Sequence, residues 1–287
     1  MKKIGIIGGS ALYNIEGLKI SKKKRIKTPF GDPSDEFVFG ELAGKQVIFL
    51  PRHGSSHSLL PTEINNKANI YAFKILDVDR VISVSAVGSL KEEILPLDVV
   101  LVDQFVDRTN QARLTTFFGE GIVAHIPFAE PICAKLKKAV YENNQNLGVK
   151  IHGKGTYLNM EGPAFSTKAE SHLYRSWGMD IIGMTNMPEA RLAREAGICY
   201  ATMAMVTDYD CWRAMGEEET VSVEMVMENL RKNVDTAKKM LSNTIRNMAD
   251  DWSCPCGQTL KHAIVTPKAA VPKATLKKLK PLIEGVV

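Results

Sequence analysis

Two carboxylates, Asp208 and Asp210, directly follow an apolar run at residues 198–206. The length and composition of that run predict a buried central strand. Carboxylates at the end of a buried strand are costly unless they have a use, because burial disfavours their charged form. An aspartate with a raised pKa can donate a proton in a reaction, so Asp208 is a candidate general acid. The residues alone leave open the simpler alternative that Asp208 caps the following loop.

Small, hydroxyl-bearing and basic residues follow several other apolar runs along the chain. Glycines let the backbone approach an anion closely, hydroxyls add donors, and arginine offers a planar fork for phosphate oxygens. Each motif alone has an ordinary alternative, such as a tight turn, a helix cap or a surface salt bridge. Together they predict an anion cradle beside Asp208, made of Ser10, Arg52, His53, Ser85 and Thr185.

Three common catalytic motifs are absent from the sequence. The segment Gly8-Gly9-Ser10 lacks the G-x-G-x-x-G spacing of dinucleotide-binding proteins, and the chain has no P-loop. It also has no nucleophile elbow and no Ser-His-Asp order. These absences argue against ATP-driven phosphoryl transfer and against acyl transfer.

The elements that must position these residues alternate between short β-branched runs and helical patterns. Predicted strands cover residues 3–7, 46–50, 80–85, 99–103, 155–160, 180–184 and 199–206, with an edge strand near Val38. Predicted helices cover residues 63–76, 130–144, 167–177 and 188–196, and the longest helix begins near Ser222. The alternation predicts an α/β fold with a central, twisted, mostly parallel or mixed sheet covered by helices. Ligands bind such sheets beyond the carboxyl ends of the strands, where Asp208 and the anion cradle fall.

The domain organisation follows from the absence of any linker that would divide the chain. We expect one domain over residues 1–265, followed by a Lys- and Pro-rich segment at 266–287. The sequence leaves open whether this segment is a short amphipathic helix packed on a neighbour or a loose tail.

The composition is ordinary for a globular protein, with 45% hydrophobic and 24% charged residues in 287 and a net charge of +5. The basic run Lys22, Lys23, Lys24 and Arg25 has no interleaved aromatic residues, so we interpret it as solvated surface rather than a nucleic-acid site. Neither a membrane-spanning apolar stretch nor a signal peptide is present in the sequence. We therefore expect a cytoplasmic protein that binds neither nucleic acid nor membranes.

Further short motifs recur in a fixed order from the first predicted strand to about Asp251. They are Ile7-Gly8-Gly9-Ser10, Thr28-Pro29-Phe30-Gly31, Arg52-His53-Gly54, Asn65 through Asn69, Gly88-Ser89-Leu90, residues 103–109, His125-Ile126-Pro127, Glu161-Gly162-Pro163 and residues 207–212. In this order they resemble the methylthioadenosine phosphorylases of the trimeric purine nucleoside phosphorylase family. The resemblance implies a nucleoside phosphorylase fold, a homotrimer or homohexamer, and inorganic phosphate as co-substrate with neither metal nor cofactor.

The resemblance also implies roles for individual residues. Those expected to bind phosphate are Gly8, Ser10, Arg52, His53, Ser85, Ala86 and Thr185. Those expected to bind the nucleoside are Phe165, Ser166, Met184, Asp208, Tyr209, Asp210, Val221, Val223 and His125. Among these, the main chain at Met184 would meet the ribose, Phe165 would pack near the purine, and His125 would reach in from a neighbouring subunit. Ser10 stands where the family more often has threonine, which preserves the hydroxyl.

The choice of base follows from hydrogen-bond chemistry at Asp208 and Asp210. Adenine presents an acceptor at N7 and an amine donor, so a protonated Asp208 can donate to N7 while Asp210 accepts from the amine. Family members that prefer 6-oxopurines tend to have asparagine at the first position, so aspartate favours adenine. The segment around Val221 and Val223 matches the family's apolar wall for a 5'-methylthio group.

The resulting expectation is a pentosyltransferase that splits 5'-methylthioadenosine with phosphate into adenine and 5-methylthioribose 1-phosphate, a step of purine and methionine salvage. Bound phosphate would stabilise positive charge on the ribose while Asp208 protonates the leaving base. The open alternatives are a phosphorylase of adenosine, methylthioinosine or inosine, a hydrolase that uses water, and a non-catalytic nucleoside-binding module.

Cys254-Pro255-Cys256 lies outside the most familiar part of the family pattern. Similar endings in heat-stable relatives join disulfides, and here a bond within the motif or to Cys199 or Cys211 is open, as are free thiols. A metal site with His262 is the remaining alternative, although zinc usually has wider ligand spacing and four ligands. We therefore expect no metal.

Overall fold

The computed structural model of the chain describes residues 3–110, 113–213 and 223–286, and for residues 223–227 it describes the backbone alone. Its centre is an 11-stranded sheet with the order β2-β3-β4-β1-β5-β10-β9-β7. A branch leaves this path at β5, which also pairs with β11, followed by β6 and β8. The strands are β1 (Lys3–Gly8), β2 (Lys19–Lys24), β3 (Phe37–Leu42), β4 (Lys45–Pro51), β5 (Val78–Ser89), β6 (Val99–Leu101), β7 (Gln104–Asp107), β8 (Ile151–His152), β9 (Thr156–Asn159), β10 (Ile181–Gly183) and β11 (Cys199–Tyr209).

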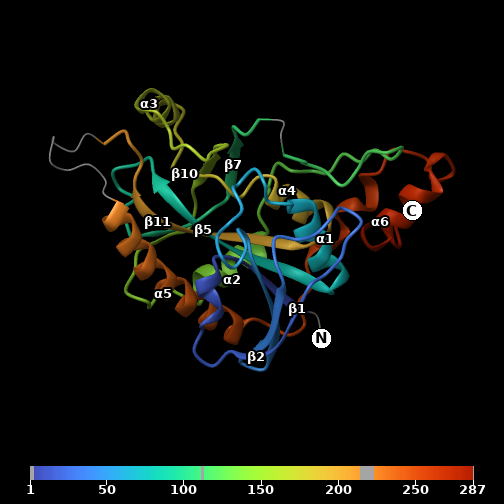
Figure 1. The fold of residues 1–287 in the computed structure, drawn as a ribbon, viewed down its shortest axis with the longest axis horizontal. Coiled ribbons are helices and arrows are strands. Elements are labelled where there is room, and N and C mark those ends of the chain that lie inside the picture. The colour runs from blue at the N-terminus through green and yellow to red at the C-terminus, as the bar shows by residue number, and fades with distance from the viewer. Residues whose placement is uncertain (1–2, 111–112, 214–222, 287) are drawn as a thin grey trace.

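Helices cover both faces of the central strands. They are α1 (Asn66–Ile75), α2 (Ala134–Glu142), α3 (Lys168–Ser176), α4 (Glu189–Glu195), α5 (Val223–Asn247) and α6 (Lys273–Ile283), with short 3-10 turns η1 (Ser10–Tyr13), η2 (Pro255–His262) and η3 (Lys268–Ala270). Figure 1 shows α2 and α5 on one side of β5 and β11, and α1 and α4 on the other. Parallel pairing of β1 with β4 and β5 and of β11 with β5, together with antiparallel pairs such as β6 with β11, confirms the predicted mixed α/β sheet.

The central strands are longer than the sequence predicted. We expected a strand at 80–85 followed by a turn, yet β5 continues to Ser89. Residues 85–89 stay in the strand because they pair with β11 on one side and, at Gly88 and Ser89, with β10 on the other. A glycine and two serines are weak strand formers, so their tertiary pairing overrides their local preference.

Two further features lie nearer the sheet's edges. The predicted strand at 99–103 ends at Leu101 as β6, and a separate strand, β7, follows at Gln104–Asp107 and pairs with a different neighbour. The lysine-rich run, predicted as solvated surface, falls largely in the edge strand β2, every residue of which is exposed. Lysine on an exposed edge strand discourages pairing with another chain.

The C-terminal segment, for which the sequence left helix and tail open, contains α6. Its Leu279, Leu282 and Ile283 are buried, and the Tyr71 hydroxyl of α1 donates to the Lys278 carbonyl at 2.9 Å. In Figure 1, α6 lies at the far end of the molecule from β11's end and α3. Among the described residues, no helix is long and apolar enough to cross a membrane.

Candidate active site

Asp208 sits just beyond an irregularity in β11. The parallel register of β11 with β5 shifts between Val206 and Asp208, so Thr207 is an extra residue in the ladder. Such bulges bend a strand and re-aim its side chains. The strand that the sequence placed at 199–206 therefore continues through Asp208 to Tyr209, and Asp208 is held by strand pairing rather than by a loop.

Burial raises the pKa of Asp208 to about 6, and the negative charge of Asp210 adds to the rise. The Thr207 hydroxyl opposes this shift by donating to Asp208 Oδ1. That hydroxyl also lies 3.2 Å from the Val87 carbonyl, and its single proton serves only one acceptor at a time. Protonation of Asp208 would satisfy both contacts, so the site accommodates the acid form that donates a proton.

Asp210 is also buried, and its backbone N–H donates to the Ser89 carbonyl at 2.9 Å. The same carbonyl accepts a hydrogen bond from the Trp212 indole at 2.8 Å, which fixes the turn after β11. Burial raises the pKa of Asp210 as well, and the nearby Ser171 hydroxyl opposes the rise. Within the described part of the chain, Asp210 Oδ2 nevertheless has no partner in well-formed hydrogen-bond geometry. A buried carboxylate oxygen without a partner is costly, and a ligand's N–H group would satisfy it.

The hydroxyls of Ser85 and Thr185 lie 3.0 Å apart, although the residues are a hundred positions apart in the chain. Ser85 belongs to β5, and Thr185 follows β10 on the way into α4. The Tyr157 hydroxyl lies 3.4 Å from the Ser85 hydroxyl. The fold therefore brings two hydroxyls of the predicted anion cradle together.

Gly8 ends β1 beside Pro51 of β4, and its carbonyl accepts a hydrogen bond from the Arg52 backbone N–H at 2.9 Å. A Cβ atom at Gly8 would lie 2.6 Å from the end of the Leu12 side chain and 3.3 Å from the Val84 carbonyl, so a larger residue here would force its neighbours to shift. Ser10 begins η1 and is half-buried, while Ala86 in β5 is exposed. Gly8 and Ser10 lie at the end of β1, as the sequence predicted, whereas Ala86 lies within β5 rather than in the predicted turn after a strand.

The guanidinium of Arg52 differs from the expectation of a free phosphate fork. It is buried and forms an ion pair with Glu189, with Nε–Oε2 at 2.9 Å and Nη2–Oε1 at 3.0 Å. It also donates to the Ser83 hydroxyl at 2.6 Å and to the Val84 carbonyl at 2.9 Å. Only the second hydrogen on Nη1 remains for a ligand. Arg52 therefore chiefly links β1, β4 and β5 to α4 through these hydrogen bonds, and it adds positive charge next to the anion cradle.

His53 is positioned as a neutral imidazole. Its Nδ1 lies 2.8 Å from the Leu59 carbonyl, so Nδ1 carries the hydrogen and Nε2 is left for a ligand. Burial lowers the pKa of His53 to about 4, with the charge of Arg52 and the nearby His57 adding to the effect. The His53 and His57 rings are stacked with centroids 4.5 Å apart.

The Glu161 turn is organised by Arg113, a residue that the sequence analysis missed. Arg113 is buried, with Nε 2.8 Å from Glu161 Oε1 and Nη1 2.7 Å from the Met184 carbonyl. The Met184 carbonyl is thus engaged by protein, so the predicted main-chain contact with ribose would come from its N–H group. The sequence analysis missed Arg113 because it does not follow a predicted strand. It missed Glu189 because an acidic residue in the first turn of a helix is common.

The remaining predicted residues lie in different settings. Phe165 is 82% exposed, whereas Ser166 and Tyr209 are buried. The His125 side chain is exposed, and its backbone N–H donates to the Ala263 carbonyl at 2.8 Å. Val221 lies outside the described residues, and Val223 is described only as the first residue of α5.

The sequence matches the phosphorylase superfamily over residues 3–246. The chain belongs to that superfamily. It is 53% identical over 284 residues to the S-methyl-5'-thioadenosine phosphorylase of Geobacter sulfurreducens, covering 99% of each chain. It is 54% identical to the protein of the same name from Koribacter versatilis, covering 98% of this chain and 95% of that one.

Solved structures agree with this membership in the phosphorylase superfamily. A methylthioadenosine phosphorylase from an antarctic soil metagenomic library has a TM-score of 0.93 and 46% identity, with 98% of both chains covered. The methylthioadenosine phosphorylase from Schistosoma mansoni in complex with adenine has a TM-score of 0.83 and 34% identity, with 100% and 99% covered. The nucleoside phosphorylase fold predicted from the sequence is therefore confirmed.

Proposed function

We propose that this chain cleaves 5'-methylthioadenosine with inorganic phosphate, releasing adenine and 5-methylthioribose 1-phosphate. The reaction makes it a pentosyltransferase of purine and methionine salvage. The names of full-length relatives at 53% and 54% identity support this substrate.

The observation that carries the proposal is the carboxyl pair at the end of β11. Asp208 has a pKa raised to about 6 and is therefore available as an acid near neutral pH. Asp210 offers a buried carboxylate oxygen that lacks a partner within the described residues. A proton donor beside an acceptor is the complement of adenine's N7 and exocyclic amine.

The anion cradle supports phosphate as the second reactant. The paired hydroxyls of Ser85 and Thr185 and the Nε2 atom of His53 are candidate contacts for phosphate oxygens. We also place Ser10, Gly8 and Ala86 among the phosphate contacts. Arg52 would act mainly through its positive charge, because most of its N–H groups already bind protein atoms. As the bond from C1' to the base lengthens, the phosphate would stabilise positive charge on the ribose while Asp208 protonates the base.

We place Phe165, Ser166, Met184 and Tyr209 around the nucleoside, and Val221 and Val223 at its 5' end. We further propose a homotrimer or homohexamer in which His125 completes the neighbour's site. Its side chain is exposed on a segment tied down by residues 263–266, which supports an outward-facing role. We also propose a cytoplasmic location, because a low, odd number of cysteines in a chain of this length is unlike the disulfide framework of a secreted protein.

The test is to incubate the purified protein with methylthioadenosine, with and without phosphate, and to measure free adenine. Adenine release that requires phosphate is the expected result. Release without phosphate would indicate a hydrolase, and binding without any release would indicate a non-catalytic module. Parallel assays with adenosine, methylthioinosine and inosine separate the proposed substrate from the other nucleosides, and faster turnover of a 6-oxopurine would overturn the assignment to adenine.

A further inference from the structure

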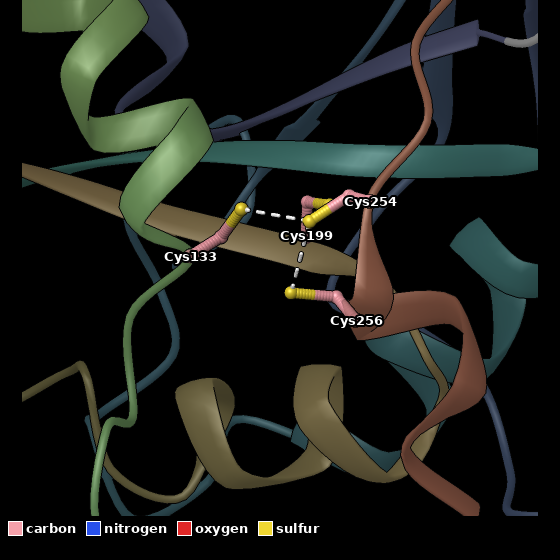
Figure 2. Close-up of side chains that lie close together, drawn as sticks. All are labelled: Cys133, Cys199, Cys254 and Cys256. Carbon is pink, nitrogen blue, oxygen red and sulfur yellow. Dashed lines mark hydrogen bonds between the residues drawn. The ribbon is translucent and has the colours of Figure 1, made fainter. Parts of the chain in front are cut away.

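Four cysteines from three distant parts of the chain meet at the start of β11. They are Cys133 at the beginning of α2, Cys199 at the beginning of β11, and Cys254 and Cys256 at the beginning of η2, and together they form the thiol cluster. Figure 2 shows the four side chains close together, with dashed lines from the sulfur of Cys254 to those of Cys133 and Cys256. Cys133 and Cys199 are buried, and the other two are half-buried. The cluster differs from the sequence expectation because it includes Cys133 and excludes Cys211 and His262.

The spacing of the sulfur atoms suits a tetrahedral ion. All four lie within 4.8 Å of one another, and the pairs Cys133–Cys254 and Cys254–Cys256 are each 3.5 Å apart. A tetrahedron with zinc–sulfur bonds of about 2.3 Å places its sulfurs about 3.8 Å apart. A disulfide would pair the sulfurs two by two at about 2.05 Å and would not require all four to converge.

Two N–H groups point at sulfur atoms of the cluster. The Leu136 backbone N–H donates to Cys133 Sγ at 3.4 Å, and the Trp252 indole N–H donates to Cys199 Sγ at 3.4 Å. A thiol is a weak acceptor, whereas a metal-bound thiolate carries negative charge and accepts such bonds well. These donors are a second observation beside the sulfur spacing, because they would stabilise the negative charge of thiolates bound to a metal ion.

We propose that the thiol cluster binds one Zn²⁺ ion per chain as a closed, structural tetrathiolate site. Four soft thiolate ligands in a tetrahedral arrangement select zinc, and four protein ligands leave no position for substrate. The sequence pattern hid the site because its ligands come from three separate segments rather than from paired Cys-x-x-Cys motifs.

The position of the site gives the ion a structural task. It would fasten η2 to the starts of α2 and β11, and η2 leads directly into the segment that holds residues 123–125. There the His125 backbone N–H donates to the Ala263 carbonyl, and the Val265 N–H donates to the Val123 carbonyl at 3.0 Å. Loss of the ion would therefore release the C-terminal segment first.

The experiment is elemental analysis of the full chain purified in the presence of reductant, combined with zinc release by a thiol-modifying reagent. We expect close to one equivalent of zinc per chain. The double variant Cys254→Ser, Cys256→Ser changes two half-buried residues and should lose the zinc. Its circular dichroism spectrum should still show a folded α/β protein, with a loss of helical signal no larger than the C-terminal helices can account for. The matched control is Cys211→Ser, which removes the only other cysteine of the chain and should retain the zinc.

Reconstitution tests the site directly. Metal-free, reduced protein titrated with Co²⁺ should develop the intense absorption of tetrahedral cobalt thiolate at one equivalent, and the double variant should not. The proposal is overturned if reduced protein binds neither ion, if stoichiometric iron takes the place of zinc, or if Cys211→Ser abolishes binding. Disulfides that persist in freshly purified, unreduced protein in place of zinc would also overturn it.

Discussion

At the scale of single residues, the central question is how Asp208 can hold a proton near neutral pH, as its proposed role requires. Asp208 is buried beside another carboxylate, and only the Thr207 hydroxyl favours its charged form. An amide at this position would donate an N–H group without ionising and would suit the acceptor oxygen of a 6-oxopurine.

We therefore expect Asp208→Asn to lower kcat/KM for methylthioadenosine by about 10²- to 10⁴-fold, the usual contribution of a general acid. Activity toward methylthioinosine should fall less or rise, so the ratio of the two substrates changes. Steady-state kinetics with both nucleosides check this. Equal losses on both would contradict the assignment of Asp208 as the residue that reads the base.

The raised pKa of Asp208 also predicts a pH-dependent cost in stability. The folded chain holds this proton up to about pH 6, whereas an ordinary aspartate loses it near pH 3.8. The free energy of unfolding that this group contributes is therefore fully present below pH 3.8 and is lost as the pH rises through about 6. Between pH 5 and pH 8 the loss is about 1 kcal/mol, because each pKa unit corresponds to roughly 1.4 kcal/mol.

Asp208→Asn should escape that loss. Urea denaturation at pH 5 and pH 8 gives the free energy of unfolding of both proteins. The stability of the variant relative to the parent protein should rise by about 1 kcal/mol from pH 5 to pH 8. A difference between the two proteins that is the same at both values would show that Asp208 ionises normally.

The paired hydroxyls of Ser85 and Thr185 make a separate prediction about phosphate. Hydrogen bonds to charged groups contribute about 1.5–3 kcal/mol, so Ser85→Ala or Thr185→Val should raise the KM for phosphate roughly tenfold or more. The KM for the nucleoside should change little. The control is Ser176→Ala, which removes an exposed hydroxyl at the end of α3. A rise confined to the nucleoside KM would remove both residues from the anion cradle.

At the scale of elements, the Arg52–Glu189 pair joins four strands to a helix. Arg52 follows β4 and contacts Ile7 in β1, Ser83 in β5 and Glu189 in α4, while the Tyr200 hydroxyl of β11 donates to Glu189 at 2.6 Å. The contacts of Arg52 with Ile7 and Val84 lie next to Gly8 and Ser85 of the predicted anion cradle, so the pair sets the geometry of the cradle.

Removing one member of a buried pair leaves an uncompensated charge, so Glu189→Gln should destabilise the protein by about 3–5 kcal/mol. The control is Glu228→Gln, which breaks the exposed pair with Lys232 in α5 and should leave stability unchanged. Both are measured by chemical denaturation. Equal stability of the two variants would show that the buried pair has no greater effect than a surface one.

The sequence predicted where most strands lie better than where they end or which side chains meet there. Runs of apolar residues located most of the core strands, and the polar residues near their predicted ends made Asp208, Ser85 and Thr185 candidates, although Asp208 and Ser85 lie within longer strands. It could not show that Arg52 binds Glu189. An acidic residue in the first turn of a helix is common, and these two residues lie 137 positions apart in the chain. Cys133 was missed for the same reason, since only the fold brings it to Cys254.

At the scale of the whole molecule, the exposed residues of the proposed site indicate that one chain would not enclose the substrate alone. Phe165 is 82% exposed, and His125 lies on a segment that runs toward the C-terminal helices, away from the end of β11 (Figure 1). A large exposed aromatic beside a substrate site is expected where a second subunit covers it. In a ring of identical subunits, each chain would give His125 to one neighbour and receive it from the other.

This arrangement predicts complementation between two inactive variants. Asp208→Asn and His125→Ala should each be impaired alone, because one lacks the acid and the other lacks the contact at the neighbour's 5' end. When the two chains are co-expressed, random assortment gives roughly one site in four both intact residues. Activity of the co-purified mixture should therefore exceed the average of the two separate variants. A mixture whose activity only equals that average would place His125 in its own chain's site or outside the site altogether.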